Sequence, residues 1–180
     1  MPATIDDLIQ LVPPPAVPKN IPTSEEWGQY EVELGCAFPS DYKQIIDTYG
    51  VGWFAGWIYL APPHEILERV KGQPRYLELC LSDWDEPYAL YPNPSGLLFC
   101  GIDDGNSFFT WRTEGSSHSW TLINFPNRPY EGSEAILAYT WLELLVGWFR
   151  GEIKNPRRGK GNQWYPTDVK PTKERFFKQR

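Results

Sequence analysis

Residues 34–52, LGCAFPSDYKQIIDTYGVG, decide the fold. They predict the end of one helix and, after Pro39, the start of a second. We expect Ser40 to cap the second helix, Asp41 to suit its positive end, and Gly50 to end it in a left-handed conformation. Four aromatic and aliphatic side chains recur within it at i, i+3, i+4 and i+7, namely Tyr42, Ile45, Ile46 and Tyr49. This spacing predicts one buried stripe.

The same kinds of signal continue on both sides of this segment. Aromatic and β-branched runs predict strands at residues 53–61, 97–102, 108–112 and 120–125, with Tyr130 in a further strand. Helical spacing and capping residues predict helices at residues 5–11, 24–34, 63–72 and 134–150. Residues 75–84 are ambiguous between helix and strand, and we favour a helix there. The order of these elements predicts an α+β fold in which an antiparallel sheet carries helices packed on one face.

Glycine and capping residues add local expectations. Gly56 predicts a bulge in the strand at 53–61, and Trp53 and Trp57, four residues apart, would share one face of that strand. Ser133 is the predicted cap of the last helix, and Gly151 its predicted end.

The pattern as a whole resembles the Knr/Smi-like family, the SUKH superfamily. The resemblance covers residues 24–151, with Phe38 in place of the usual Leu and Gly50-Val51-Gly52 in place of Asn-Gly-Gly. It is carried by the order and spacing of Leu34, Gly35, Phe38, Pro39, Asp41, Tyr42, Lys43, Asp103, Asp104, Gly105, Trp111, Trp120, Trp141, Leu142, Leu145 and Gly151.

The resemblance implies a non-enzymatic protein-binding domain. For bacterial members of the family it implies an immunity protein that binds a cognate toxin, of the nuclease or deaminase type, and neutralises it by occlusion. Fungal relatives imply an alternative, a regulatory scaffold that binds several signalling proteins. A glycan-binding module that uses the aromatic residues is a third interpretation.

Charge divides the chain unevenly. Residues 1–150 carry 20 acidic and 8 basic side chains, whereas residues 151–180 carry 3 acidic and 9 basic ones. We therefore divide the chain into an N-terminal arm with a proline-rich segment (1–23), a SUKH-like domain (24–151) and a basic tail (152–180). An acidic domain suits a basic protein partner, such as a toxin domain, and an ordinary acidic surface explains the count equally well. The basic tail is the only candidate for contact with nucleic acid, which we do not expect.

Catalytic and metal-binding patterns are not apparent in the sequence. The three cysteines, Cys36, Cys80 and Cys100, form no CxxC pair, and we expect free thiols in a reducing cytoplasm. His64 and His118 have no partner at metal-ligand spacing. We expect no enzyme activity, no cofactor, and no signal peptide or membrane span, which together predict a cytoplasmic protein.

Aromatic and acidic residues near the predicted turns are the candidate partner contacts. Asp103-Asp104-Gly105-Asn106 has the composition of a hairpin turn in which Asp bonds its own backbone, and we prefer that interpretation to a metal or acid–base site. The side chains that we expect to contact a partner are Trp53, Trp57, Asp83, Asp85, Asp103 and Asp104.

Overall fold

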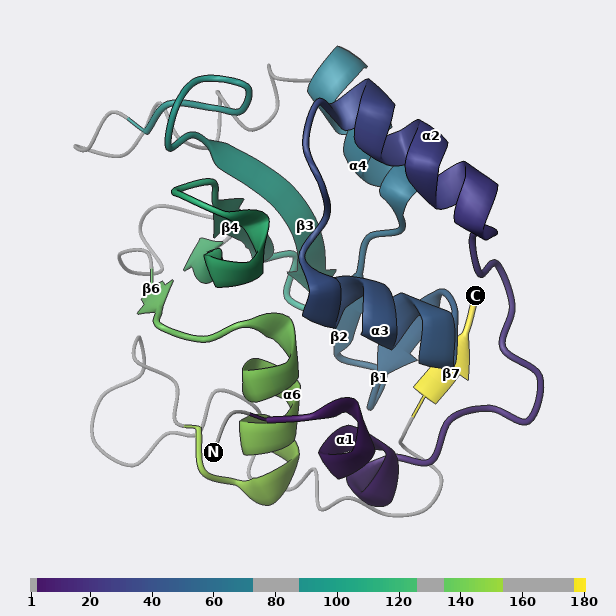
Figure 1. Cartoon of the computed structure of the whole chain (residues 1–180). Helices are drawn as coiled ribbons and strands as arrows, with labels where there is room; N and C mark the ends of the chain where they lie inside the picture. The colour runs from purple at the N-terminus through teal and green to yellow at the C-terminus, as the bar shows by residue number, and fades with distance from the viewer. Residues whose placement is uncertain (1–2, 73–87, 126–134, 154–176) are drawn as a thin grey trace.

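The computed structural model describes residues 3–72, 88–125, 135–153 and 177–180. Within these ranges helices pack against an antiparallel sheet (Figure 1), and the predicted α+β class is confirmed. The helices are α1 (Ile5–Leu11), α2 (Ser24–Leu34), α3 (Ser40–Tyr49), α4 (Pro63–Gly72) and α6 (Trp141–Arg150), with a short 3-10 turn, η1 (Ser117–Ser119). The strands are β1 (Gly52–Phe54), β2 (Ile58–Leu60), β3 (Leu97–Asp103), β4 (Phe108–Arg112), β5 (Thr121–Phe125), β6 (Ala135–Leu137) and β7 (Phe177–Gln179), in the order β6-β5-β4-β3-β2-β1-β7.

The buried stripe of α3 is confirmed. Its four side chains are at most 1% exposed, and two of their hydroxyls are satisfied by backbone carbonyls. The hydroxyl of Tyr42 donates to the carbonyl of Ala61 at 2.6 Å, and that of Tyr49 donates to the carbonyl of Val12 at 2.6 Å. These two bonds connect α3 to the end of β2 and to the end of α1, because a buried phenol needs an acceptor.

The start of α3 differs from the prediction. Pro39 occupies the cap position, which places Ser40 inside the first turn, and no side chain caps the helix. Asp41 instead accepts a hydrogen bond from the backbone N–H of Leu142 at 3.2 Å, at the start of α6. Gly50 does have a positive φ of 71°, but with ψ at −159°, a region that only glycine visits readily.

Aromatic rings join α2 and α3 to the sheet. Tyr42 lies 5.1 Å from Trp111 of β4 and 6.1 Å from Trp27 of α2, both at nearly perpendicular ring planes. Phe38 contacts the same three rings, and all four side chains are at most 5% exposed. Edge-to-face pairs of this kind stabilise a core beyond their buried area. These rings therefore fill the core rather than a surface.

The middle strand of the sheet, β3, has a bulge beside a closely packed glycine. The pairing of β3 with β4 shifts between Phe99 and Gly101. A Cβ atom at Gly101 would lie 2.5 Å from the carbonyl oxygen of Tyr59 and 3.2 Å from the ring of Trp141. Glycine at this position lets β2 and α6 approach the strand from two sides.

The strand predicted at 53–61 is wrong, because these residues form two strands. β1 turns back on β2 through Ala55 and Gly56, which both have positive φ values, of 50° and 67°. Gly56 is therefore a turn residue rather than a bulge. As a result Trp53 lies on β1 and Trp57 lies in the turn, so the two do not share a face of one strand.

The helix predicted at 134–150 begins later than expected. Leu137 and Ile136 belong to β6, which pairs with β5 through Leu122 and Ile123. The helix starts after Thr140, whose hydroxyl accepts from the backbone N–H of Glu143 at 3.4 Å in a capping box. Gly151 ends the helix in the left-handed conformation, as predicted.

Residues from both ends of the described chain pack against its centre. Leu8 of α1 is fully buried, and α1 lies against α6 and α3. β7 pairs with β1 at the edge of the sheet (Figure 1), and Phe177 contacts Tyr49 and Phe54 at 5.4 and 5.0 Å.

Several predictions lie outside the described residues. These are the helix at 75–84, the strand at Tyr130 and the cap at Ser133. Among the helices of the described ranges, none has the length and apolar character needed to cross a bilayer.

Candidate functional site

Three of the six predicted contact residues lie at two adjacent turns, and a fourth, Trp53, lies on β1. Trp57 lies in the turn between β1 and β2, and Asp104 lies in the turn between β3 and β4. The backbone N–H of Asp104 donates to the carbonyl of Trp57 at 2.9 Å, which holds the two turns together. Asp103 ends β3 opposite Ile58. The other two predicted residues, Asp83 and Asp85, lie outside the described residues.

Asp103 and Asp104 have different surroundings. Asp103 is 6% exposed, and its Oδ1 accepts from the backbone N–H of Ser107 at 2.9 Å. Asn106 has a φ of 58°, and its N–H donates to the carbonyl of Asp103 at 2.9 Å. The predicted hairpin turn is therefore confirmed, with the Asp103 carboxylate bonded inside it. Asp104 is exposed.

Trp53 belongs to a row of side chains that crosses three strands. Trp53 pairs with Tyr59 on β2, and Tyr59 pairs with Ile102 on β3. Directly paired residues point to the same face of a sheet. Phe54, the neighbour of Trp53, packs on Tyr49 of α3. The row therefore lies on the face turned away from α3.

A cleft of about 730 Å³ opens over this row. Its floor contains Tyr59, which is 2% exposed, with the partly buried Trp53 ring 5.2 Å away. One wall comes from α4, where Glu65, Glu68 and Arg69 follow helical spacing. The lining residues are Trp53, Tyr59, Glu65, Glu68, Arg69, Gly72, Phe99, Ile102 and Arg180.

A polar network occupies one end of the cleft. The Tyr59 hydroxyl donates to Glu65 Oε1 at 2.8 Å, and Arg180 Nη1 lies 3.0 Å from the same oxygen. Arg180 Nη1 also donates to the Tyr59 hydroxyl at 3.1 Å, and its guanidinium lies 5.6 Å from the centre of the Tyr59 ring. The guanidinium thus meets a carboxylate, a phenol and an aromatic face at once, a combination that recognises Arg or Lys.

Burial and the network shift two pKa values upward. Burial raises the pKa of Tyr59 well above its usual 10.0, and the hydrogen bond to Glu65 raises it further. The hydrogen bond to Tyr59 raises the pKa of Arg180, and the charge of Glu65 adds to this. Tyr59 is therefore a neutral hydrogen-bond donor at physiological pH, and Arg180 keeps its charge.

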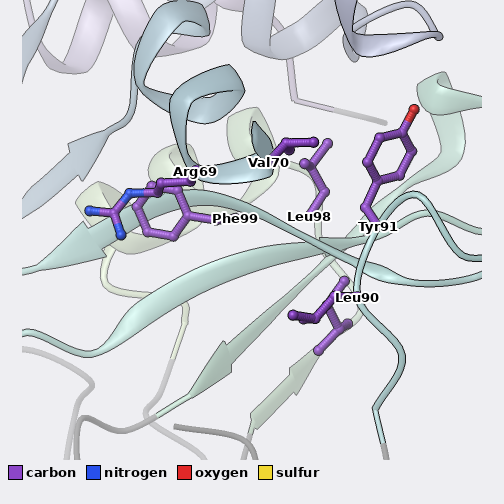
Figure 2. A pocket seen from close by; sticks show the side chains of 7 residues that line it. Arg69, Val70, Leu90, Tyr91, Leu98 and Phe99 are labelled. Carbon is purple, nitrogen blue, oxygen red and sulfur yellow. The ribbon is translucent and has the colours of Figure 1, made fainter. Parts of the chain in front are cut away.

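A small cavity next to the cleft lies where α4 packs against β3. It holds about 20 Å³ between α4, β3 and the segment at Leu90 and Tyr91, room for about one water molecule. Figure 2 shows the Arg69 side chain against the Phe99 ring, where the guanidinium lies 4.0 Å from the ring centre. This contact fixes the C-terminal half of α4 over β3.

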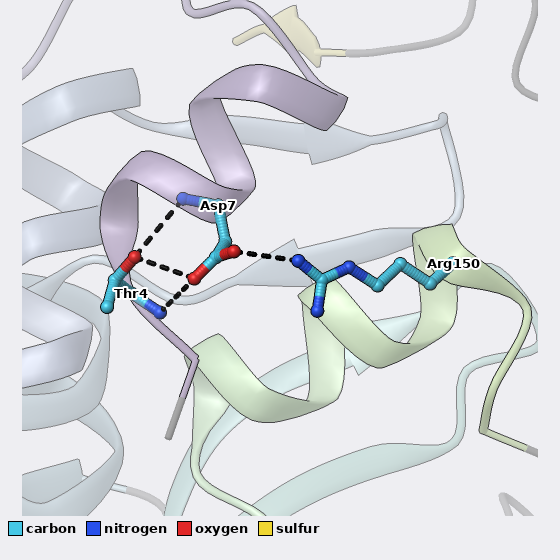
Figure 3. A network of polar contacts seen from close by, with 3 residues as sticks. All are labelled: Thr4, Asp7 and Arg150. Carbon is cyan, nitrogen blue, oxygen red and sulfur yellow. Dashed lines mark hydrogen bonds and ion pairs between the residues drawn. The ribbon is translucent and has the colours of Figure 1, made fainter. Parts of the chain in front are cut away.

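A second open cleft of about 810 Å³ lies between α1 and α6. Beside it Asp7 and Thr4 form a capping box at the start of α1, and Asp7 pairs with Arg150 at 2.7 Å (Figure 3). The hydrogen bonds from Thr4, followed by those from Arg150, lower the pKa of Asp7. The hydrogen bonds and the ion pair between these groups join α1 to α6, which is a structural role.

The thiols and histidines of the described ranges are dispersed. Cys100 is fully buried and Cys36 partly buried, both as free thiols, and burial raises the pKa of each. His64 and His118 are exposed. In the part of the chain that the structure describes, no three His, Cys, Asp or Glu side chains gather as metal ligands.

Sequence reasoning found Trp53 but missed the rest of the cleft. Tyr59 could have been predicted, because it lies two residues after Trp57 in the same aromatic segment. Glu65 and Glu68 are three residues apart on a predicted helix, so a shared helix face was also predictable. Arg180 carries no local signal, because its place depends on pairing between strands more than 100 residues apart in the chain.

The chain matches no protein-family model, no curated protein and no solved structure. What characterises this protein is therefore its own structure, an α+β domain whose sheet carries a cleft lined by aromatic residues, two glutamates and two arginines.

Proposed function

We propose that this protein is a non-enzymatic binding domain of the immunity type, which neutralises a basic toxin domain by occluding it. The observation that carries the proposal is the guanidinium of Arg180 between Tyr59 and Glu65. It supports a ligand that presents an Arg or Lys side chain, with its charge on a carboxylate and, for Arg, its flat guanidinium on a ring.

The surroundings of the cleft support a protein as the ligand. Trp53 is half-buried at the rim, and tryptophan is enriched among the residues that dominate binding energy at protein interfaces. Glu68, which lines the cleft, and Asp104, in the turn after β3, are both exposed and add negative charge. The excess of acidic residues over residues 1–150 would steer a basic partner towards this surface.

The sequence resemblance of residues 24–151 to the Knr/Smi-like family suggests a protein-binding role, which for bacterial members of that family is immunity. It implies a partner of the nuclease or deaminase type, whose substrate-binding surface is basic because nucleic acid is anionic. A domain with excess acidic side chains over residues 1–150, and with Glu65 and Glu68 beside the aromatic floor of its cleft, can cover such a surface without any chemical step.

An affinity capture with the full chain as bait tests the proposal. We expect one basic protein from the native cells, whose toxic activity is blocked on binding. The amount of it recovered should fall as the salt concentration rises from 50 to 500 mM, because the Debye length shortens from about 14 to about 4 Å and screens the attraction between charges. Recovery of many partners with no activity inhibited would exclude the immunity role.

Three variants localise the interface. Trp53→Ala should weaken partner binding by about 30-fold, as expected for an aromatic anchor worth about 2 kcal/mol. Glu68→Gln should weaken it by several-fold and reduce the salt dependence. Glu114→Gln is the matched control, because it removes the same charge from an exposed pair with Arg112 away from the cleft.

One observation favours the scaffold as the second candidate. Val32 on the outer side of α2 is 84% exposed, and Glu33 beside it pairs with Lys71. A scaffold needs more than one binding surface, and α2 offers a second. Loss of some captured partners in Trp53→Ala and of others in Val32→Lys would favour this role.

A further inference from the structure

One end of the cleft is occupied by the chain's own strand β7. β7 pairs antiparallel with β1 at the edge of the sheet, with Phe54 opposite Phe177, Trp53 opposite Lys178, and Gly52 opposite Gln179. The ladder continues past the strand, because the N–H of Arg180 donates to the carbonyl of Val51 at 3.1 Å. Figure 1 shows β7 alongside β1 at this edge.

The two faces of β7 make different contacts. Phe177 points to the helix side and packs between Tyr49 and Phe54. Arg180, three positions later, points into the cleft and contacts Tyr59 and Glu65. An extended segment with an aromatic residue followed at i+3 by a basic residue therefore fits this edge, because alternate strand residues face opposite sides.

We propose that the β1 edge and the cleft form a docking site for an extended basic segment of the partner protein, and that residues 177–180 are a built-in occupant which the partner displaces. The inference rests on the proposed function, since it names the mode by which the same cleft binds. Addition of a strand to a sheet edge supplies backbone hydrogen bonds, and the side-chain seats supply selectivity.

The contacts that residues 177–180 make are weak enough for a partner segment to replace them. The Arg180 side chain is 65% exposed, and an ion pair this exposed contributes little to stability. Lys178 is exposed, and the strand is three residues long. Glu68 and Ile102 line the cleft beyond the groups that Arg180 contacts, next to Arg69, which covers the Phe99 ring. A longer basic segment would gain these contacts in addition to those of β7.

Gly52 provides a steric means to block this edge. A Cβ atom at Gly52 would lie 2.6 Å from Cζ of Phe177 and would overlap the carbonyl oxygen of Lys178. Gly52 does not have a positive φ, so alanine fits the backbone of β1 itself. Gly52→Ala should therefore exclude any strand from this position while β1 and β2 stay paired.

The experiment uses the full chain and a fluorescein-labelled peptide, RFFKQR, which repeats residues 175–180. Phe177→Ala removes the aromatic anchor of the built-in strand and leaves the edge and the cleft intact. Fluorescence anisotropy should show the peptide binding at least tenfold more tightly to Phe177→Ala than to the wild type, because a tethered segment competes at an effective concentration on the order of millimolar. Arg180→Ala, whose side chain is exposed, should give a smaller increase in the same direction and serves if Phe177→Ala does not fold.

The controls define the site. Addition of Gly52→Ala to Phe177→Ala should abolish binding of the peptide. A peptide with alanine in place of its second phenylalanine and its last arginine should bind at least tenfold more weakly. Equal peptide affinity in the wild type and in Phe177→Ala, or binding that survives Gly52→Ala, would overturn strand displacement.

The outcome separates this inference from the proposed function. If the captured partner binds and depends on Trp53 while the peptide does not bind, strand displacement is wrong and the binding role stands. If the peptide follows the expected order while no inhibited partner is found, the docking site stands and the immunity role is wrong.

Discussion

Replacement of Tyr42 by phenylalanine tests the contact that joins α3 to the sheet. Tyr42 is fully buried, and its hydroxyl donates to the carbonyl of Ala61 at 2.6 Å. Phenylalanine keeps the ring contacts with Trp27, Phe38 and Trp111 but leaves that carbonyl without its donor. A buried acceptor left unsatisfied costs about 1–3 kcal/mol. At about 2–4 °C per kcal/mol for a chain of this size, a loss of ~2 kcal/mol lowers Tm by about 4–8 °C.

Urea unfolding followed by circular dichroism measures this change at pH 7. The urea midpoint of Tyr42→Phe should fall with an unchanged m value, because the same surface is exposed on unfolding. Tyr139→Phe is the matched control, since that ring is 38% exposed, and its effect should stay within about 0.5 kcal/mol. A Tyr42→Phe midpoint equal to that of the control would refute the role of the hydroxyl bond.

The dependence of stability on alkaline pH is a second, independent test of the burial of Tyr42. Burial raises the pKa of Tyr42 well above its usual 10.0. The stability that the neutral phenol contributes is therefore fully present below pH 10 and is lost as the pH rises further, because the unfolded chain ionises first. One proton corresponds to about 1.4 kcal/mol per pH unit. Above pH 10 the stability of Tyr42→Phe should fall less steeply than that of the wild type, and parallel curves would contradict the assignment.

Three further substitutions test other parts of the fold. Thr140→Ala removes the capping box that Thr140 forms with Glu143, and urea unfolding should show a loss of about 0.5–2 kcal/mol, whereas Thr140→Ser should restore most of it. Gly101→Ala places a Cβ atom 2.5 Å from the carbonyl of Tyr59 and should cost about 1–3 kcal/mol or more; an unchanged Tm would show that β2 and β3 are not this close. Burial raises the pKa of Asp41 above 3.8, so the wild type loses stability as the pH rises through that raised value. The asparagine in Asp41→Asn does not titrate. The stability of this variant relative to the wild type should therefore increase from pH 3 to pH 7 in urea unfolding.

Elements with strong local signals were predictable from the sequence. The buried stripe of α3, the turn at Asp103, and the glycine that ends α6 each rest on residues close together in the chain. The spacing of apolar residues sets the stripe, a side chain that bonds the nearby backbone sets the turn, and a glycine with a positive φ ends the helix. The fold class followed from the order of these elements.

The errors have two physical causes, a rare local backbone conformation and pairing between distant residues. Ala55 adopts a positive φ of 50°, which alanine rarely does, so the hairpin of β1 and β2 carried only Gly56 as a signal. Ile136 and Leu137 suit a helix by spacing, and their pairing with β5 draws them into a strand. The cleft was found only through Trp53 because Glu65 and Arg180 meet through tertiary structure.

The position of β7 in the sheet also sets the order in which the domain is completed during translation. β1 is synthesised about 120 residues before β7, its neighbour at the edge. At roughly 5–20 residues per second, the ribosome needs about 6–24 s to cover that length. During this interval the β1 edge is open to any strand that is present, and its length of three residues limits what can pair with it. The nascent chain thus exposes, for some seconds, the edge of β1 that β7 covers in the folded domain.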